Sequence, residues 1–536
     1  MPVPLQSRKL AKARFAFKAT SSIAIAIAFL GNAAGAQAVT WTALANNNWK
    51  TTGFWTGLVG GDLYPNNGAN TYTVTIAANA GQNGTTSVVL DASTGAPAST
   101  ITLSGLALAP VLDISGNPAA ELVLGAGMTL NAGNLTNFSG TTLSGGRYFI
   151  DGTFRFNNAN IVTLAAGTTL IMDNANAHVY AAAGSVNALA NLANNAGTFD
   201  IRNGYNHTAV TNFNNSGIVS VSEGSTFTTA GNLTNTGTLL ASGTIGTSTI
   251  AVNSTTMANA GGNLLAGNNG RVAISGSTIN GGALTTSGNG TVTFSNNGAN
   301  FISGVALNGT VDMTAATSTV RVTNSMTMSG GLVKVDKGSV LAFQGTQSLS
   351  GTGSILFGSD VNSKLAIDQS NAQFTIGSGI LVHGQSGIIG AQHFVGTNNA
   401  IIVNNGTISA DVNTGTLTIT QASVTNNNIL DAKNGGTLNI NTAINNSAAG
   451  KLTASNNGVL LLNGAAVSGG TISTTTGGKF VATNNSANFL NDATLNGRID
   501  LATATGSIRV NGLTGLTMQA GSIIDINNNS ILTFNG

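Results

Sequence analysis

Apolar and polar residues alternate through most of this chain. In GTFDIRN (197–203), Phe199 and Ile201 fall on one face, and in GIVSVSE (217–223) Val219 and Val221 repeat the arrangement. A period of two is typical of strands with one buried face, and no sustained helical spacing occurs after residue 38. The pattern therefore predicts an all-β protein.

One phrase of asparagine, glycine and an apolar residue returns about every 20 residues. NNAGTFD, NNSGIVS and TNTGTLL begin at residues 194, 214 and 234 and share an asparagine column at Asn195, Asn215 and Asn235. The glycine of the phrase forms a second column. Further along the chain this column contains Gly406, Asn428 and Gly450, which are equally spaced and slightly further apart than the first three copies of the phrase. Short strands in such a period predict a right-handed parallel β-helix with coils of about 20–22 residues.

Stacked coils place equivalent residues about 4.8 Å apart. We expect inward Val, Ile, Leu and Phe to form a dry core, and the asparagine column to form a ladder of bonded amides. Asn replaces Gly in the glycine column, and both residues tolerate the left-handed backbone of a tight turn, so we interpret that column as a turn position. About 500 residues at about 21 per coil predict some 24 coils, a rod on the order of 110 Å long.

The composition fits this architecture. Only 7% of the residues are charged, against about 25% in ordinary soluble proteins, and like charges in one column would repel each other. Cysteine is absent, so no disulfide stabilises the chain, and no proline follows Pro118. A proline-free run suits continuous backbone pairing, because proline cannot donate to a strand ladder.

The N-terminus predicts export. Basic residues precede the apolar run IAIAIAFL at 23–30, and Ala36-Gln37-Ala38 forms an A-x-A cleavage site, so we interpret residues 1–38 as a Sec signal peptide. Five of the 19 basic residues and none of the 17 acidic ones lie there, which leaves 14 basic and 17 acidic residues. Without a basic excess the mature chain is not expected to bind nucleic acid.

The sequence therefore divides into three parts. Residues 1–38 are the signal peptide, and residues 39–120, which hold all three tryptophans and four of the six prolines, are expected to form an N-terminal cap. Residues 121–536 form the β-helical repeat region, in which the phrase is least regular at 341–400.

The repeats resemble a known group of proteins. NLTNTGTL (232–239), NNSGIV (214–219) and NNGTI (404–408), with the tryptophan-containing stretch before TYTVTIA (71–77), are similar to passenger regions of Gram-negative autotransporters and to filamentous-haemagglutinin-type adhesins. The resemblance implies an extracellular or cell-surface location. Because neither a barrel pattern nor a sorting tail precedes Gly536, we interpret the chain as a truncated coding sequence, a released passenger or a protein exported by another route.

The inventory of reactive side chains is thin. β-Helical lyases and glycosidases need acidic groups that converge on one face, and 15 Asp and 2 Glu are spread over the whole chain. Asp411 and Asp431 have the spacing of one coil and are expected to stack, whereas the members of the pairs Asp360/Asp368 and Asp492/Asp500 are closer together in sequence. The four histidines, His178, His207, His383 and His393, lack metal-ligand spacing.

The sequence therefore assigns no catalytic, cofactor-binding or metal-binding residue, and any specialised site is expected within 341–400. We expect a secreted or cell-surface structural protein that attaches to surfaces, matrix, polysaccharide or other cells by weak multivalent contacts. Two alternatives stay open: a β-helical polysaccharide lyase or glycosidase, and a surface-layer or fibre subunit that self-associates through the ends of the solenoid.

Overall fold

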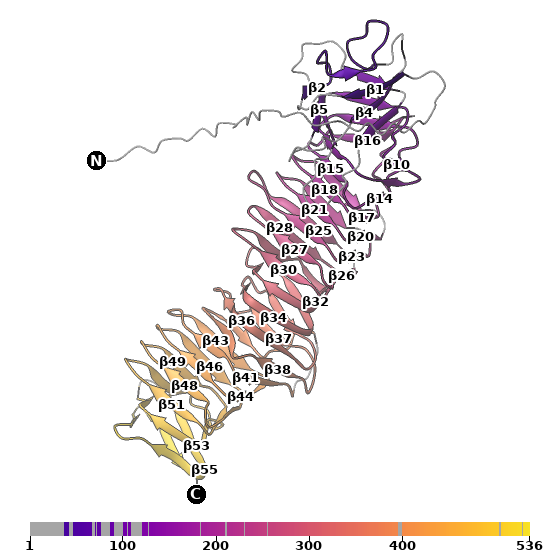
Figure 1. Cartoon of the computed structure of the whole chain (residues 1–536). Helices are drawn as coiled ribbons and strands as arrows, with labels where there is room; N and C mark the ends of the chain where they lie inside the picture. The colour runs from indigo at the N-terminus through magenta and orange to yellow at the C-terminus, as the bar shows by residue number, and fades with distance from the viewer. Residues whose placement is uncertain are drawn as a thin grey trace, which may run out of the picture.

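The chain folds as an elongated parallel β-solenoid, seen in Figure 1 as a rod of stacked coils. This computed structural model describes residues 37–536 except for short gaps, at 42–46, 67–69, 71, 77–85, 91–99, 104, 109–119, 127, 183, 210–211, 230, 254–255, 395–398, 503–504, 528 and 536. Among the described residues no helix has the length and hydropathy needed to cross a membrane. The predicted all-β parallel solenoid is confirmed.

Most strands belong to one sheet of 49 strands that winds around the rod as three ladders. Ladder 1 comprises β2 (Asn47–Asn48), β5 (Thr86–Leu90), β8 (Ala120–Leu124), β12 (Arg147–Ile150), β15 (Thr169–Met172), β18 (Thr198–Ile201), β21 (Ile218–Val221), β24 (Thr238–Ala241), β27 (Asn263–Ala266), β30 (Ala283–Thr286), β32 (Asn296–Asn308), β34 (Thr319–Val335), β36 (Gln347–Phe357), β38 (Gln373–Ile376), β41 (Ile401–Asn404), β44 (Ser423–Asn426), β47 (Ile444–Asn446), β50 (Ala466–Ser468), β53 (Phe489–Asn496), β55 (Ser507–Met518) and β57 (Ile531–Phe534).

The other two ladders share the long strands with ladder 1. Ladder 2 comprises β10 (Phe138–Ser139), β11 (Thr142–Leu143), β14 (Thr163–Leu164), β17 (Asn194–Asn195), β20 (Phe213–Asn215), β23 (Leu233–Asn235), β26 (Thr256–Ala258), β29 (Thr278–Asn280), β32, β34, β35 (Val340–Phe343), β37 (Lys364–Ile367), β40 (Gly387–Ile389), β43 (Thr416–Thr420), β46 (Thr437–Asn441), β49 (Val459–Leu462), β52 (Lys479–Ala482), β54 (Arg498–Leu501) and β56 (Ile523–Ile526). Ladder 3 comprises β19 (Asn206–Ala209), β22 (Thr226–Thr229), β25 (Ser248–Asn253), β28 (Gly270–Ser275), β31 (Thr291–Phe294), β33 (Thr310–Met313), β34, β36, β39 (Gly379–Gly384), β42 (Thr407–Ala410), β45 (Ile429–Ala432), β48 (Lys451–Ala454), β51 (Thr471–Thr474), β53 and β55.

Two small sheets complete the first coils. One contains β1 (Gln37–Trp41), β3 (Trp55–Thr56), β4 (Tyr72–Ile76) and β7 (Gly105–Leu108), and the other contains β6 (Thr100–Leu103), β9 (Thr129–Ala132), β13 (Thr153–Phe156) and β16 (His178–Ala181). In the first, β3 pairs with β1 in antiparallel direction, and the Trp55 ring packs edge-on against Trp41. The predicted signal peptide lies outside the described residues except for Gln37 and Ala38, and the cap at 39–120 stays a prediction.

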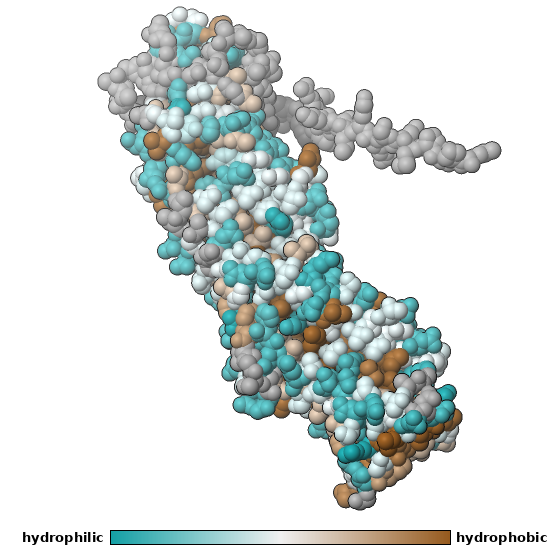
Figure 2. Space-filling view, turned by 180° about the vertical axis from the view of Figure 1, so that it is seen from behind, coloured by the Kyte–Doolittle hydropathy of each residue, from teal (hydrophilic) through white to brown (hydrophobic). Residues whose placement is uncertain are grey.

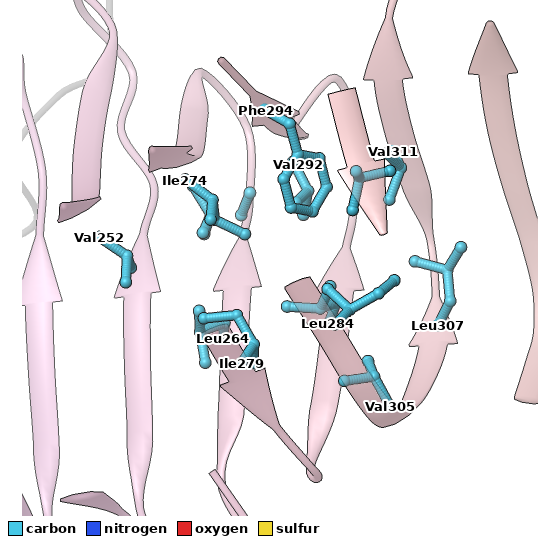
Figure 3. Packing of buried hydrophobic residues seen from close by; sticks show 14 of the residues in the cluster. Val252, Leu264, Ile274, Ile279, Leu284, Val292, Phe294, Val305, Leu307 and Val311 are labelled. Atoms are coloured by element: carbon cyan, nitrogen blue, oxygen red, sulfur yellow. The ribbon is translucent and has the colours of Figure 1, made fainter. Parts of the chain in front are cut away.

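The core is a set of apolar columns, one residue per coil. Phe199, Val219 and Leu239 are register partners in ladder 1 and are fully buried. Figure 3 shows how the columns meet: Leu264 lies opposite Ile274, and Leu284 lies opposite Val292, both of ladder 3. Burial of each such side chain contributes about 1.5–3 kcal/mol, so stability is distributed along the rod.

The asparagine column forms the predicted amide ladder. The Asn195 Nδ2 donates to Asn215 Oδ1 at 2.8 Å, Asn215 donates to Asn235 at 2.8 Å, and Asn235 donates to Asn259 at 2.8 Å. A second ladder runs from Asn404 through Asn426 to Asn446, at 2.8 and 2.7 Å. These buried amides lie inside the corner between two ladders, where each donates to the next one along its ladder. The Oδ1 atoms of Asn195 and Asn404, which begin the two ladders, have no hydrogen-bond partner among the described residues.

Glycine occupies its column for a different reason from the one predicted. Gly197, Gly217 and Gly237 do not have positive φ angles, so the left-handed turn interpretation is wrong. A Cβ on Gly217 would lie 2.0 Å from the Gly197 carbonyl oxygen, and one on Gly237 would lie 2.1 Å from that of Gly217. At Gly197, Gly217 and Gly237 a side chain is excluded because the backbone of the preceding coil touches the position.

The number of coils is smaller than predicted. About 18 turns are formed within the described residues, because several coils are longer than the repeated phrase. One long coil runs from Thr163 to its register partner Asn194, and another runs from Ile389 to its register partner Ile419.

The ladders are irregular in the middle of the rod. The long strands β32, β34 and β36 pass around corners, and the pairing register shifts between Asn296 and Phe301, between Ser303 and Val305, and between Ser329 and Gly331. Figure 1 shows the rod changing direction in this part. Extra unpaired residues bend a strand and increase its twist, which accounts for the bend.

The glycine column yields a direct test by substitution. Gly217→Ala should lower the free energy of unfolding by about 1–3 kcal/mol, because the new Cβ collides with the Gly197 carbonyl. Asn428→Ala is the matched control, because this coil already accommodates a Cβ at the equivalent position. The hydrogen bond from the Ile429 N–H to the Gly406 carbonyl oxygen is correspondingly long there, at 3.4 Å. That variant should change stability by less than about 0.5 kcal/mol. Urea midpoints measure both, and equal midpoints would contradict the explanation.

Candidate functional site

A recess of the described surface lies beside the first coils of the repeat region. It has a volume of about 480 Å³ and opens to solvent. Its walls come from four successive turns that connect ladder 1 to the strands on the neighbouring face, and they are formed by Ala126, Asp151, Gly152, Thr153, Asn174, Ala175, Asn176 and Asn203. We call this recess the turn cleft.

Unequal turn lengths create the cleft. Only residues 151–152 connect β12 to β13, whereas the turns before and after it span residues 125–128 and 173–177. The short turn is therefore recessed between two longer ones. Gly152 makes the short turn possible, because a Cβ there would lie 2.3 Å from the Met128 carbonyl oxygen.

Hydrogen bonds hold the polar wall of the cleft in place. The Asn174 Nδ2 donates to the Asp151 carbonyl oxygen at 2.7 Å, and its Oδ1 accepts from the Asn176 backbone N–H at 2.5 Å. The Asn203 Nδ2 donates to Asp173 Oδ1 at 3.1 Å. The Thr153 hydroxyl and the Asn176 side-chain amide make no hydrogen bond within the described part of the chain, so they are available to a ligand.

The electrostatics of the cleft are acidic. Burial raises the pKa of Asp151, against a hydrogen bond from the backbone of Ala126. Burial also raises the pKa of Asp173, opposed by Arg202 and reinforced by the charge of Asp151. Arg202 is already paired with Asp200, so the local charge disfavours an anion.

An aromatic surface continues from the cleft along β13 and β16. Thr153 and Arg155 are the register partners of His178 and Tyr180. The His178 and Tyr180 rings stack at a centroid distance of 4.7 Å, and the Arg155 guanidinium lies 4.7 Å from the centre of the Tyr180 ring. Polar groups in the cleft thus border a half-buried aromatic pair, an arrangement that suits an amphipathic ligand.

The sequence did not single out these residues. Asp151 and Asp173 directly follow Ile150 and Met172, which are register partners in adjacent coils. Their separation in the sequence by one coil was the feature that could have identified them as neighbours. The recess itself depends on the difference in length between neighbouring turns, which no residue motif marks.

The predicted stacking of Asp411 and Asp431 is wrong. Asp431 pairs in register with Ser409, and its carboxylate accepts from the Ser409 hydroxyl at 2.9 Å and from the Thr453 hydroxyl at 2.6 Å. Asp411 instead bonds to His383, with 2.9 Å between Oδ2 and Nδ1. These side chains satisfy each other along ladder 3 and leave no converging acid pair.

The other acidic pairs are also separated. Asp492 accepts from the Thr514 backbone and hydroxyl, while Asp500 lies 3.0 Å from the Lys479 Nζ. Asp360 accepts from the Asn362 backbone N–H at 2.9 Å, whereas Asp368 is fully buried. Across the described ranges, no group of three or more His, Asp or Glu side chains is arranged to hold a metal ion.

The stretch 341–400 contains a loop that folds back on the rod. Asp368 Oδ1 accepts the backbone N–H groups of His393 and Phe394, at 2.8 and 3.0 Å. The guanidinium carbon of Arg321 lies 4.4 Å from the centre of the Phe394 ring and 4.6 Å from the centre of the Phe301 ring. This contact fastens the loop across the bend of the solenoid, which is a structural role.

Comparisons with known proteins add little to this description. No protein-family profile and no curated protein matches the chain. Among solved structures, the chain is similar to the crystal structure of a TibC-catalysed hyper-glycosylated TibA fragment, residues 55–350 of that protein, with 14% identity and a TM-score of 0.21. The match covers 63% of this chain and 99% of that one.

The buried histidine of the core generates a pH prediction. His207 lies between the rings of Phe199 and Phe227, and its Nε2 has no hydrogen-bond partner among the described residues. Burial lowers the pKa of His207 from 6.5 to about 4. As the pH falls, the unfolded chain therefore binds a proton at this histidine at a higher pH than the folded chain does. The free energy of unfolding decreases between pH 6.5 and pH 4, by about 3 kcal/mol in total.

His207→Leu should remove this part of the acid sensitivity. The variant and the natural chain are compared by urea midpoints at pH 7.5 and pH 4.5, and the drop in midpoint should be smaller in the variant. An identical drop in both chains would show that protonation of His207 does not contribute.

Proposed function

We propose that the protein is a secreted or cell-surface adhesive solenoid, which attaches to matrix, polysaccharide or other cells by many weak contacts. The observation that carries the proposal is the long run of parallel rungs from β8 to β57, whose outer positions are mostly uncharged. Figure 2 shows such a surface, in which polar and neutral residues cover most of the rod. Repeated rungs present many similar contact points, so avidity replaces a deep pocket.

Location and export follow from the same proposal. The signal-peptide pattern at 1–38 and the resemblance of the repeats to autotransporter passengers and filamentous-haemagglutinin-type adhesins favour display outside a Gram-negative cell. An outer-membrane export machinery is then the expected partner during secretion. Nucleic acid is not an expected partner, because the chain beyond residue 38 carries no basic excess.

Specific observations favour the two alternatives. The neighbouring carboxylates Asp151 and Asp173, with raised pKa values, are the feature that a polysaccharide lyase or glycosidase would use. Self-association through the ends of the solenoid is favoured by apolar side chains that the last described coil leaves exposed, among them Ile523, Ile531 and Phe534. We propose a non-enzymatic attachment function because acidic side chains are few and, apart from this cluster, are spread along the chain.

Attachment can be measured with the purified chain on beads. Beads coated with increasing densities of residues 39–536 should attach to extracellular matrix or polysaccharide-coated surfaces, with a steeper than proportional rise expected from multivalent binding. Beads coated with serum albumin provide the control.

Two results would overturn the adhesive proposal. One is attachment no greater than that of the albumin beads at any density. The other is time-dependent cleavage of the polysaccharide that Asp151→Asn abolishes, which would establish the enzyme instead.

A further inference from the structure

We infer that the turn cleft is a binding site for a neutral sugar residue of a glycan, an inference that deepens the proposed attachment function by naming a ligand class. The site stands on its shape, its polar groups and its charge. Other acidic groups of the rod are engaged within the chain: Asp431 accepts from the Ser409 and Thr453 hydroxyl groups, and Asp368 Oδ1 accepts two backbone N–H groups.

The shape suits a small ligand. A volume of about 480 Å³ lies within the range of ligand pockets, about 300–1,000 Å³. The cleft is fixed by backbone contacts, because Gly152 packs against the turn before it and Asn174 is bonded to the Asp151 carbonyl. A ligand therefore enters a recess that already exists and does not need to order it.

The polar groups match hydroxyl groups. A sugar hydroxyl both donates and accepts, and the cleft offers an accepting carboxylate at Asp151, a donating and accepting amide at Asn176, a hydroxyl at Thr153 and the Asn203 side-chain oxygen. Hydrogen bonds to a charged partner are about twice as strong as neutral ones, so Asp151 should dominate binding. The stacked His178 and Tyr180 rings extend the surface for the apolar face of a following sugar.

The charge decides between classes of glycan. Asp151 and Asp173 lie close together, and the guanidinium of Arg202 is engaged by Asp200. Sialylated, sulfated and phosphorylated glycans would meet repulsion at Asp151, since the Arg155 guanidinium, which would attract them, is not part of the cleft wall and lies over the Tyr180 ring. A metal ion is disfavoured because no third metal-binding side chain joins these carboxylates within the described chain. The neutral hexose or N-acetylhexosamine unit is the class that remains.

The test uses the purified chain 39–536 and an array of immobilised neutral and anionic glycans, followed by titration calorimetry with the neutral glycans that bind. We expect saturable binding to neutral glycans that weakens about tenfold or more in Asp151→Asn and in Asn176→Ala. The matched control is Asn484→Ala, which removes an exposed asparagine from a later turn without a recess, and it should bind like the natural chain.

Three results would overturn the inference: no glycan bound, a preference for anionic glycans, or equal binding by Asp151→Asn and Asn484→Ala. Calcium titration without glycan tests the competing ligand, and tight binding of the ion that Asp151→Asn abolishes would also refute the sugar site. Circular dichroism of each variant verifies that the solenoid is intact.

The result for the turn cleft and the result for adhesion can be told apart. Bead attachment that persists in Asp151→Asn, with no glycan bound by the natural chain, would refute the cleft and keep adhesion. Glycan binding by a chain whose beads never attach would keep the cleft and refute adhesion.

Discussion

The stacking of coils at strand spacing is the constraint on which this molecule depends. Hydrogen-bonded strands lie about 4.8 Å apart, so each residue has the equivalent residue of the next coil directly beside it. Residue types that gain from such repetition fill the columns: phenylalanine, valine and leucine in the column of Phe199, and asparagine in the column of Asn215. Glycine is required where the backbone of one coil touches the next, as at Gly217.

The same constraint explains why charges are rare and why several of them pair between coils. Arg147 and Glu121 are register partners in adjacent coils, and their Nε and Oε1 atoms lie 2.7 Å apart. Lys479 similarly reaches Asp500 in the next coil. Opposite charges gain from this proximity and like charges lose, so a long solenoid tolerates few charges and uses Thr, Ser and Asn on its outer faces.

The sequence predicts what repeats and does not predict what differs between coils. The period, the two-residue alternation and the column of Asn195 were sufficient for the parallel solenoid and its amide ladder. The stacking of Asp411 and Asp431 was predicted wrongly because the coil there is longer than the separation of the two aspartates and puts Ser409, not Asp411, beside Asp431. The turn cleft was missed because it arises from a short turn between longer ones, a difference visible only once the strands are placed.

The central claim is that each repeat of the phrase is one rung of an unbroken ladder. Because the chain has no cysteine, spin labels can be attached to single introduced cysteines, one at Ala283 and the other at Thr198, Thr169 or Arg147. These positions are four, five and six coil steps from Ala283 in one register. Pulsed electron resonance should give distances of about 19, about 24 and about 29 Å, rising by about 4.8 Å per coil. Distances that do not rise in such steps would contradict the solenoid.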